Sequence, residues 1–136
     1  MFGKNHPTSI KTLIAQGTRI EGDMTFEDGL RVDGEVCGAI EARAGGASLL
    51  VISEGAVAEG GLAADHVIIN GTVKGSVEAR ELLELQPKAR IEGDVQYAAL
   101  EMHQGATIVG QLRPMAARTA SAEGDKPLVR LASKSA

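Results

Sequence analysis

The strongest constraint on the fold is a short phrase of alternating apolar residues and glycines that recurs along the chain. The clearest copy spans residues 67–77 and reads VIINGTVKGSV. The phrase occurs six times, and the second glycines of the copies are Gly22, Gly38, Gly60, Gly75, Gly93 and Gly110. These glycines lie 16, 22, 15, 18 and 17 residues apart, and the longest gap contains a predicted loop insertion at residues 43–48. Self-similarity at a short, nearly fixed period is typical of a solenoid.

The spacing inside each copy predicts β-strands. Apolar residues stand two apart, as Val67 and Ile69 do, so their side chains point to the same face of a strand. Each run is only about four to six residues long, which is too short to bury a face alone. Stacked coils would bury the inward side chains in one continuous core, and glycine permits the tight bends. We therefore predict an all-β chain that forms a single-stranded parallel β-helix of about six turns with roughly three faces.

The extent of the repeat sets the domain boundaries. Residues 14–113 are predicted to form the β-helix, and residues 1–13, which carry no repeat, are predicted to be a flexible N-terminal segment. Residues 114–136 begin with Pro114, lack any period and are predicted to be a disordered C-terminal tail. The apolar residues within 128–131 have two interpretations, a docking patch for a partner or part of a plain tail, and the plain tail is favoured.

Charge and composition exclude several classes of function. Residues 14–112 hold 16 acidic and 7 basic side chains, so the body lacks the basic, aromatic-lined surface that nucleic acids require. Neither Gly45-Gly46 nor Gly60-Gly61 has the lysine and the strand-loop-helix setting of a phosphate-binding loop. We therefore expect neither nucleic acid nor nucleotide as a partner. The chain also lacks a run of 18 apolar residues, and its N-terminus lacks the apolar core of a signal peptide.

The titratable residues form no recognisable reactive site. His6, His66 and His103 are far apart, and none has a second His, Cys or carboxylate at metal-ligand spacing. Cys37 follows the inward Val36, so its thiol is predicted to point outward near a corner and to be inert. We predict no catalytic residue, no metal site and no cofactor.

An enzymatic alternative is a hexapeptide-repeat acyltransferase, which also coils at about 18 residues per turn in steps of six. Residues 14–19 would pass as one such hexad, and His103 would be the candidate base. Against this, only four positions separate the inward residues Val32 and Val36, which breaks the step of six. Neither the extended loop nor the helical extension usual in such enzymes is visible, so a non-enzyme is favoured.

The N-terminus has two interpretations. Met1 and Phe2 are apolar, and Lys4 and Lys11 are basic, so the segment could insert in a membrane while its lysines contact anionic headgroups. The other interpretation is an ordinary disordered start. Burial of one Phe contributes only about 1.5–3 kcal/mol, so stable binding would depend on many copies in one polymer.

The two ends of the β-helix are predicted to associate with other copies. Neither end has a capping helix pattern, and an uncapped coil end exposes open strand edges that template pairing. If the first turn were a free end, Phe26, Met24 and Ile20 would leave apolar area in water. The predicted interface consists of Ile14, Ile20, Met24, Phe26, Leu100, Met102, Ile108 and Leu112.

The ordered motifs resemble a known family. They are IAQGT at 14–18, IEGDMTF at 20–26, GLRVDGEV at 29–36, GTVKG at 71–75 and IEGDV at 91–95. Together they resemble the bactofilins, which are bacterial polymer-forming cytoskeletal proteins, over about residues 12–113. The insertion at 43–48 and Cys37 depart from the family pattern.

The resemblance implies a right-handed, triangular β-helix that polymerises end to end without nucleotide. It further implies a cytoplasmic filament on the inner face of the cytoplasmic membrane that localises cell-wall synthases or hydrolases and influences cell shape. Head-to-tail assembly and assembly through like ends both stay open.

Overall fold

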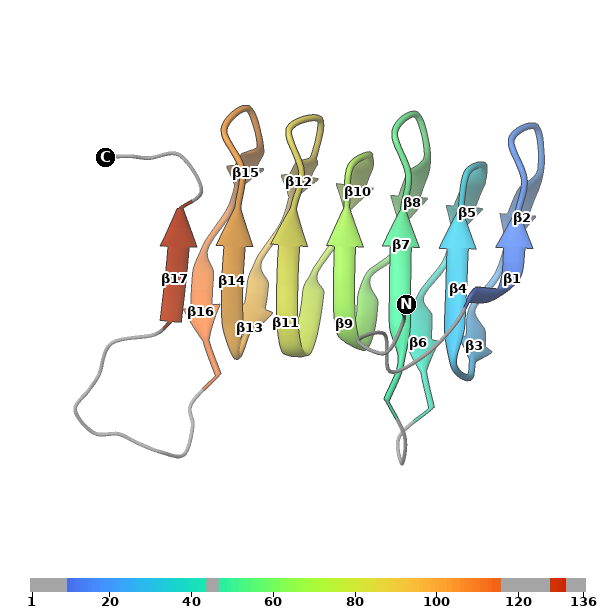
Figure 1. Ribbon diagram of the computed structural model, residues 1–136. Coiled ribbons are helices and arrows are strands. Elements are labelled where there is room, and N and C mark those ends of the chain that lie inside the picture. The colour runs from blue at the N-terminus through green and yellow to red at the C-terminus, as the bar shows by residue number, and fades with distance from the viewer. Residues whose placement is uncertain (1–9, 44–46, 116–127, 132–136) are drawn as a thin grey trace.

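The computed structural model describes residues 10–43, 47–115 and 128–131. These residues form 17 strands, and no helix occurs among them. The strands wind into a coil with three faces, in which each strand pairs in parallel with the equivalent strand of the next turn (Figure 1). One face is a six-stranded sheet with one strand from each turn. The structure confirms the predicted parallel β-helix of six turns.

The strands divide among the three faces of the coil. The first face contains β1 (Ile10–Ile14), β4 (Gly29–Val32), β7 (Leu49–Ile52), β14 (Ala99–Met102) and β17 (Leu128–Leu131). The second face contains β2 (Arg19–Glu21), β5 (Glu35–Cys37), β8 (Val57–Glu59), β10 (Thr72–Lys74), β12 (Arg90–Glu92) and β15 (Thr107–Val109). The third face contains β3 (Met24–Phe26), β6 (Ile40–Ala42), β13 (Val95–Tyr97) and β16 (Leu112–Pro114). Two long strands, β9 (Leu62–Ile69) and β11 (Val77–Leu85), continue from the third face into the first.

The handedness of the coil follows from the path of the chain. In Figure 1 the chain ascends along the front strands, from β1 to β14, and returns behind them while it advances toward the C-terminal end. This path makes the coil right-handed, which is the usual hand for a crossover between parallel strands.

Inward side chains form ladders that run the length of the coil. On the second face, Val36, Val73 and Ile91 are each 0% exposed and Ala58 is 1% exposed, and register pairing places them one above another. The first face has an equivalent ladder of fully buried residues, which are Val32, Ile52, Ile69 and Leu85. The predicted inward register is therefore confirmed. Cys37, next to buried Val36, is half-buried on the outer side, as expected.

β1 and β17 extend outside residues 14–113, the range predicted for the coil. β1 starts at Ile10, inside the segment predicted to be flexible, and reaches its register with β4 through an irregularity between Ile10 and Thr12. β17 lies inside the predicted disordered tail and pairs with β14. β1 ends at Ile14, where the first copy of the glycine phrase begins, whereas the sequence after β17 contains no glycine. The predictions for residues 1–9, 116–127 and 132–136 lie outside the described residues.

Candidate self-association surfaces at the ends of the coil

The first turn exposes part of the core at the N-terminal end. On the second face Ile20 is the first residue of the inward ladder, and it is only partly buried, whereas the next residue, Val36, is 0% exposed. Met24 of β3 is likewise partly buried, whereas Ile40 beside it is 1% exposed. Both residues pack on the core from one side only. The first turn therefore presents an apolar surface along the coil axis.

The last turn exposes the opposite end of the same ladders. Met102 and Ile108 are partly buried and pack on the core. Leu112 of β16 is 44% exposed, whereas Val95, its register neighbour on β13, is 0% exposed. The predicted interface residues therefore do lie in the first and last turns of the coil.

Three predicted interface residues are buried within the subunit itself. Ile14 is 4%, Phe26 is 7% and Leu100 is 1% exposed. The expectation that Phe26 stands in water is therefore wrong. Its register neighbour on β6 is Ala42, and the small alanine leaves room for the large ring to pack into the coil. Leu100 lies on β14 beneath β17, which pairs with it.

Three exposed apolar residues at the ends were not predicted. Among the described residues the large hydrophobic side chains classed as exposed are Ile10 (40%), Leu13 (55%), Val109 (55%) and Leu112 (44%). All four lie in the first or the last turn. A sequence signal exists for Leu13 and Val109, because each occupies an outward position at which the adjacent turn has a charged residue, Arg31 or Glu92.

Open strand edges accompany these apolar residues. In the six-stranded sheet, β2 and β15 are the outermost strands. Interior strands of that sheet pair on both sides, as β10 does with β8 and β12, whereas β2 pairs with β5 and β15 with β12. Each end thus combines backbone groups that can accept another strand with an apolar core section. This combination is suited to binding a second coil.

A comparison with protein families bears directly on this arrangement. The model of the bactofilin family, described as polymer-forming cytoskeletal, matches residues 12–113. The chain belongs to the bactofilin family. The match covers nearly the whole coil. The bactofilins are a family of structural, cytoskeletal proteins. No curated protein and no solved structure was found to match the chain.

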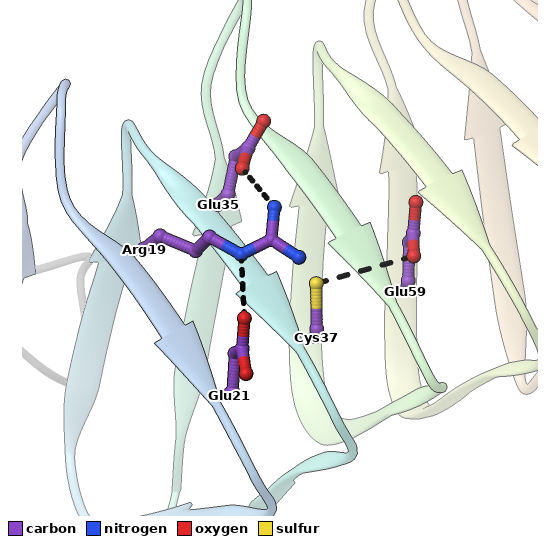
Figure 2. Close-up of polar contacts among 5 residues, drawn as sticks. All are labelled: Arg19, Glu21, Glu35, Cys37 and Glu59. Carbon is purple, nitrogen blue, oxygen red and sulfur yellow. Dashed lines mark hydrogen bonds and ion pairs between the residues drawn. The ribbon is translucent and has the colours of Figure 1, made fainter.

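The sides of this bactofilin coil differ from its ends, because they carry ladders of charge. Figure 2 shows one on the second face, where Arg19 Nε lies 2.9 Å from Glu21 Oε2 and Arg19 Nη1 lies 3.0 Å from Glu35 Oε1. The hydrogen bond to Glu21 raises the pKa of Arg19 above its ordinary value. Cys37 Sγ lies 4.0 Å from Glu59 Oε1 on the neighbouring strand. Exposed ion pairs add little stability, so this ladder chiefly keeps the sides polar.

The residues considered for an enzymatic site lie at a corner of the coil. His103 Nε2, the candidate base of the acyltransferase alternative, lies 3.3 Å from Glu84 Oε2. This contact joins adjacent turns at a corner. Within residues 10–43, 47–115 and 128–131, no group of three or more His, Cys, Asp or Glu side chains is arranged to hold a metal ion. A polar groove nearby, lined by Asp33, Ser53 and Asn70 among others, follows the same corner.

Of the predicted membrane residues, the structure describes Lys11 alone, and Met1, Phe2 and Lys4 lie outside the described residues. Lys11 Nζ lies 2.9 Å from Asp28 Oδ2. The hydrogen bond from Lys11 to Asp28 raises the pKa of the lysine. Because Asp28 compensates its charge, Lys11 is a weaker candidate for a headgroup contact than the sequence suggests. No helix in the described part of the chain is long and apolar enough to span a membrane.

Proposed function

We propose that this bactofilin assembles end to end into filaments by stacking one coil on another, without nucleotide. The observation that carries the proposal is the distribution of exposed core. Ladder positions that are completely buried in the middle turns become partly exposed in the first and last turns, as Ile20 and Ile108 do on the second face. A second subunit would bury them in the same way as a further turn.

The contact would be driven by apolar burial and strand pairing. About 400 Å² of apolar contact contributes about 10 kcal/mol before the costs of association are subtracted. No step of this assembly requires a phosphate group. Since the contact is apolar rather than ionic, salt should weaken it little. Stacking of unlike ends and stacking of like ends are both compatible with these surfaces.

Charges placed on the exposed end residues should prevent filament formation. In the full chain, Ile20→Glu with Ile108→Glu changes the partly exposed inward residues at the two ends of the second-face ladder, and circular dichroism checks that the subunit remains folded. The two carboxylates would lose water and face an apolar surface in each joint, at a cost of several kcal/mol. We expect single subunits or short oligomers by sedimentation and negative-stain electron microscopy, in buffer without nucleotide.

The matched control is Lys74→Glu. Lys74 is exposed on the same face of the coil as Ile20 and Ile108, but it lies in a middle turn and on the outer side of β10. This variant and the parent should both form long filaments. Long filaments from the doubly charged variant would show that the ends are not the joint, and a parent that assembles only with added nucleotide would contradict the proposed mechanism.

We further propose that the filament lies on the cytoplasmic face of the inner membrane, where it localises cell-wall synthases or hydrolases and influences cell shape. Family membership supports this proposal, since the family is cytoskeletal. The membrane contact would come from Met1, Phe2 and Lys4. A cell that carries the filament-deficient variant should lose the localised position of those enzymes, as seen by fluorescence microscopy.

Deletion of residues 1–8 should abolish binding to vesicles that contain anionic phospholipids and leave filaments intact. The deletion removes the apolar pair and Lys4 but ends before β1, which starts at Ile10. Co-sedimentation with vesicles measures the binding, and microscopy checks the filaments. Lys11→Ala is the matched comparison and should change binding little, because Lys11 pairs with Asp28. Unchanged binding after the deletion would place the contact elsewhere on the chain.

A further inference from the structure

The C-terminal strand β17 occupies an edge at which another subunit would pair. It lies beyond β14 on the first face, at the C-terminal end of the coil (Figure 1). The pairing is parallel, and it matches Ala99 with Leu128, Leu100 with Val129, Glu101 with Arg130 and Met102 with Leu131. The strand thus continues the first face by one further position, with the parallel pairing found between successive turns.

The sequence of β17 resembles that of an interior strand. It reads LVRL at residues 128–131, and β4 reads GLRV at residues 29–32. Register pairing carries the position of Arg31 through successive turns of the first face to Glu84, Glu101 and Arg130. The arginine therefore occupies the register position opposite Glu101, which in turn pairs with Glu84. Opposite charges at neighbouring strand positions favour pairing.

We infer that residues 128–131 form a displaceable cap, which competes with a second copy of the chain for the edge of β14. The inference rests on the end-to-end assembly proposed above and adds its regulation. A subunit whose cap is in place cannot offer β14 to a neighbour. Assembly through the C-terminal end then requires β17 to leave.

The cap covers one face of the end and leaves the other two uncovered. Leu100, on the strand beneath β17, is 1% exposed. Val109 on the second face is 55% exposed and Leu112 on the third face is 44% exposed. Because β17 stands one strand higher than β15 and β16, a neighbouring coil cannot stack flush on this end. The cap therefore hinders assembly but leaves uncovered the apolar surface that drives assembly.

Pro114 restricts the same end further. The amide of Met115 donates to the carbonyl oxygen of Tyr97 at 2.7 Å. Amide groups of successive strand residues point in opposite directions, so the nitrogen of Pro114 faces away from β13, toward the open side of β16. Proline has no N–H, and this edge therefore lacks one donor for an incoming strand. Among the described residues, the N-terminal edges of β2 and β3 have no such feature.

Tethering gives the cap an advantage over a second subunit. Residues 116–127 connect β17 to the coil, so its pairing is intramolecular and operates at an effective concentration of about millimolar. A subunit at micromolar concentration competes only through the additional contacts of all three faces. If the capped form makes up about 90% of the subunits, the apparent assembly constant at this end is about tenfold weaker than the intrinsic one.

Release of the cap should therefore promote assembly. In the full chain, Val129→Asp with Leu131→Asp places carboxylates at the two inward register positions of β17, opposite Leu100 and Met102. The six turns of the coil do not include these residues. We expect the critical concentration for polymerisation, measured by sedimentation, to fall by about tenfold. Hydrogen exchange of the β14 amides in dilute, unassembled protein should become faster.

A charge exchange provides the matched control. Arg130→Glu places a like charge opposite Glu101 and should lower the critical concentration in the same direction, by less. Arg130→Glu combined with Glu101→Arg restores the opposite charges and should return the critical concentration to that of the parent. A mere change in net charge would not be reversed by the second substitution.

The possible outcomes distinguish failure of the cap proposal from failure of the proposed end-to-end assembly. Unchanged polymerisation and unchanged β14 exchange in the release variant, with normal filaments from the parent, would overturn the cap alone. Loss of filaments in the release variant would also overturn it, because β17 would then be part of the joint. Failure of the parent and the release variant to polymerise at any concentration would overturn the proposed function and the cap with it.

Discussion

A carboxylate at position 73 should severely destabilise the coil. Val73 is 0% exposed and lies between Ala58 and Ile91 in the inward ladder of the second face. Val73→Asp would put an acidic group among aliphatic side chains with no partner that could accept or donate a hydrogen bond. Substitutions of this kind destabilise a protein by about 4 kcal/mol or more. The total stability of a domain is about 5–15 kcal/mol, so the substitution should remove a large part of it and lower the melting temperature strongly.

Thr72→Asp is the control for this substitution. Thr72 precedes Val73 on β10 and is partly exposed on the outer side, so a carboxylate there keeps its water. Thermal unfolding followed by circular dichroism should show a large loss of stability for position 73 and a change of about 0.5 kcal/mol or less for position 72. Equal effects at the two positions would mean that the inward register is shifted by one residue.

The interior of the coil could be predicted because each turn repeats the same pattern of alternating apolar residues and corner glycines. An apolar residue two positions from the next fixes which side of a strand is inward, and a glycine fixes the corner. The fully buried Val36, Val73 and Ile91 follow from this pattern alone. The insertion at residues 43–48 was found by the same pattern, and it lies between β6 and β7.

The strands at the ends could not be predicted in this way. β1 and β17 form because an edge is available beside them, at β4 and β14. That edge exists only in the folded coil. A segment of four residues, such as 128–131, is too short for its sequence to indicate that it will pair there. Short segments of this kind pair or stay free according to long-range contacts.

The sequence placed the candidate self-association surfaces at the two ends of the coil, but it did not identify every side chain that is exposed there. The first and last copies of the repeat identify the two ends, so Ile20 and Leu112 could be found from the sequence. The burial of Phe26 depends on the size of its neighbour across the strand, Ala42, which only the register reveals. Leu13 was missed because the period-2 pattern was used to find inward residues, and Leu13 occupies an outward position.

Alanine in place of Gly93 should also disrupt the coil. Gly93 has a φ of 149°, and a Cβ at this position would lie 2.2 Å from the carbonyl oxygen of Gly75 in the preceding turn. Backbone in the stacked turns cannot yield without separating the strands. We expect Gly93→Ala to lower the free energy of unfolding by about 4 kcal/mol or more, as measured by denaturant unfolding.

Gly22→Ala should separate stability from assembly. Gly22 holds the corresponding corner of the first turn with a φ of 126°, yet a Cβ there would meet nothing within 4 Å. The backbone strain alone costs about 1–3 kcal/mol, so the subunit should remain folded. In the later turns the same Cβ would point toward the preceding turn, as it does from Gly38 toward Gly22. The added methyl group of Gly22→Ala therefore points out of the N-terminal end, toward any coil stacked there.

A joint with the ordinary strand spacing of about 4.8 Å leaves no room for that methyl group. We therefore expect Gly22→Ala to give folded subunits whose N-terminal ends no longer associate, seen as short oligomers by sedimentation and electron microscopy. Gly55→Ala supplies the control for strain, since Gly55 has a φ of 88°, also has nothing within 4 Å and lies in the third turn. It should lose similar stability and still form long filaments. Long filaments from Gly22→Ala would mean that the N-terminal ends do not stack flush at this corner.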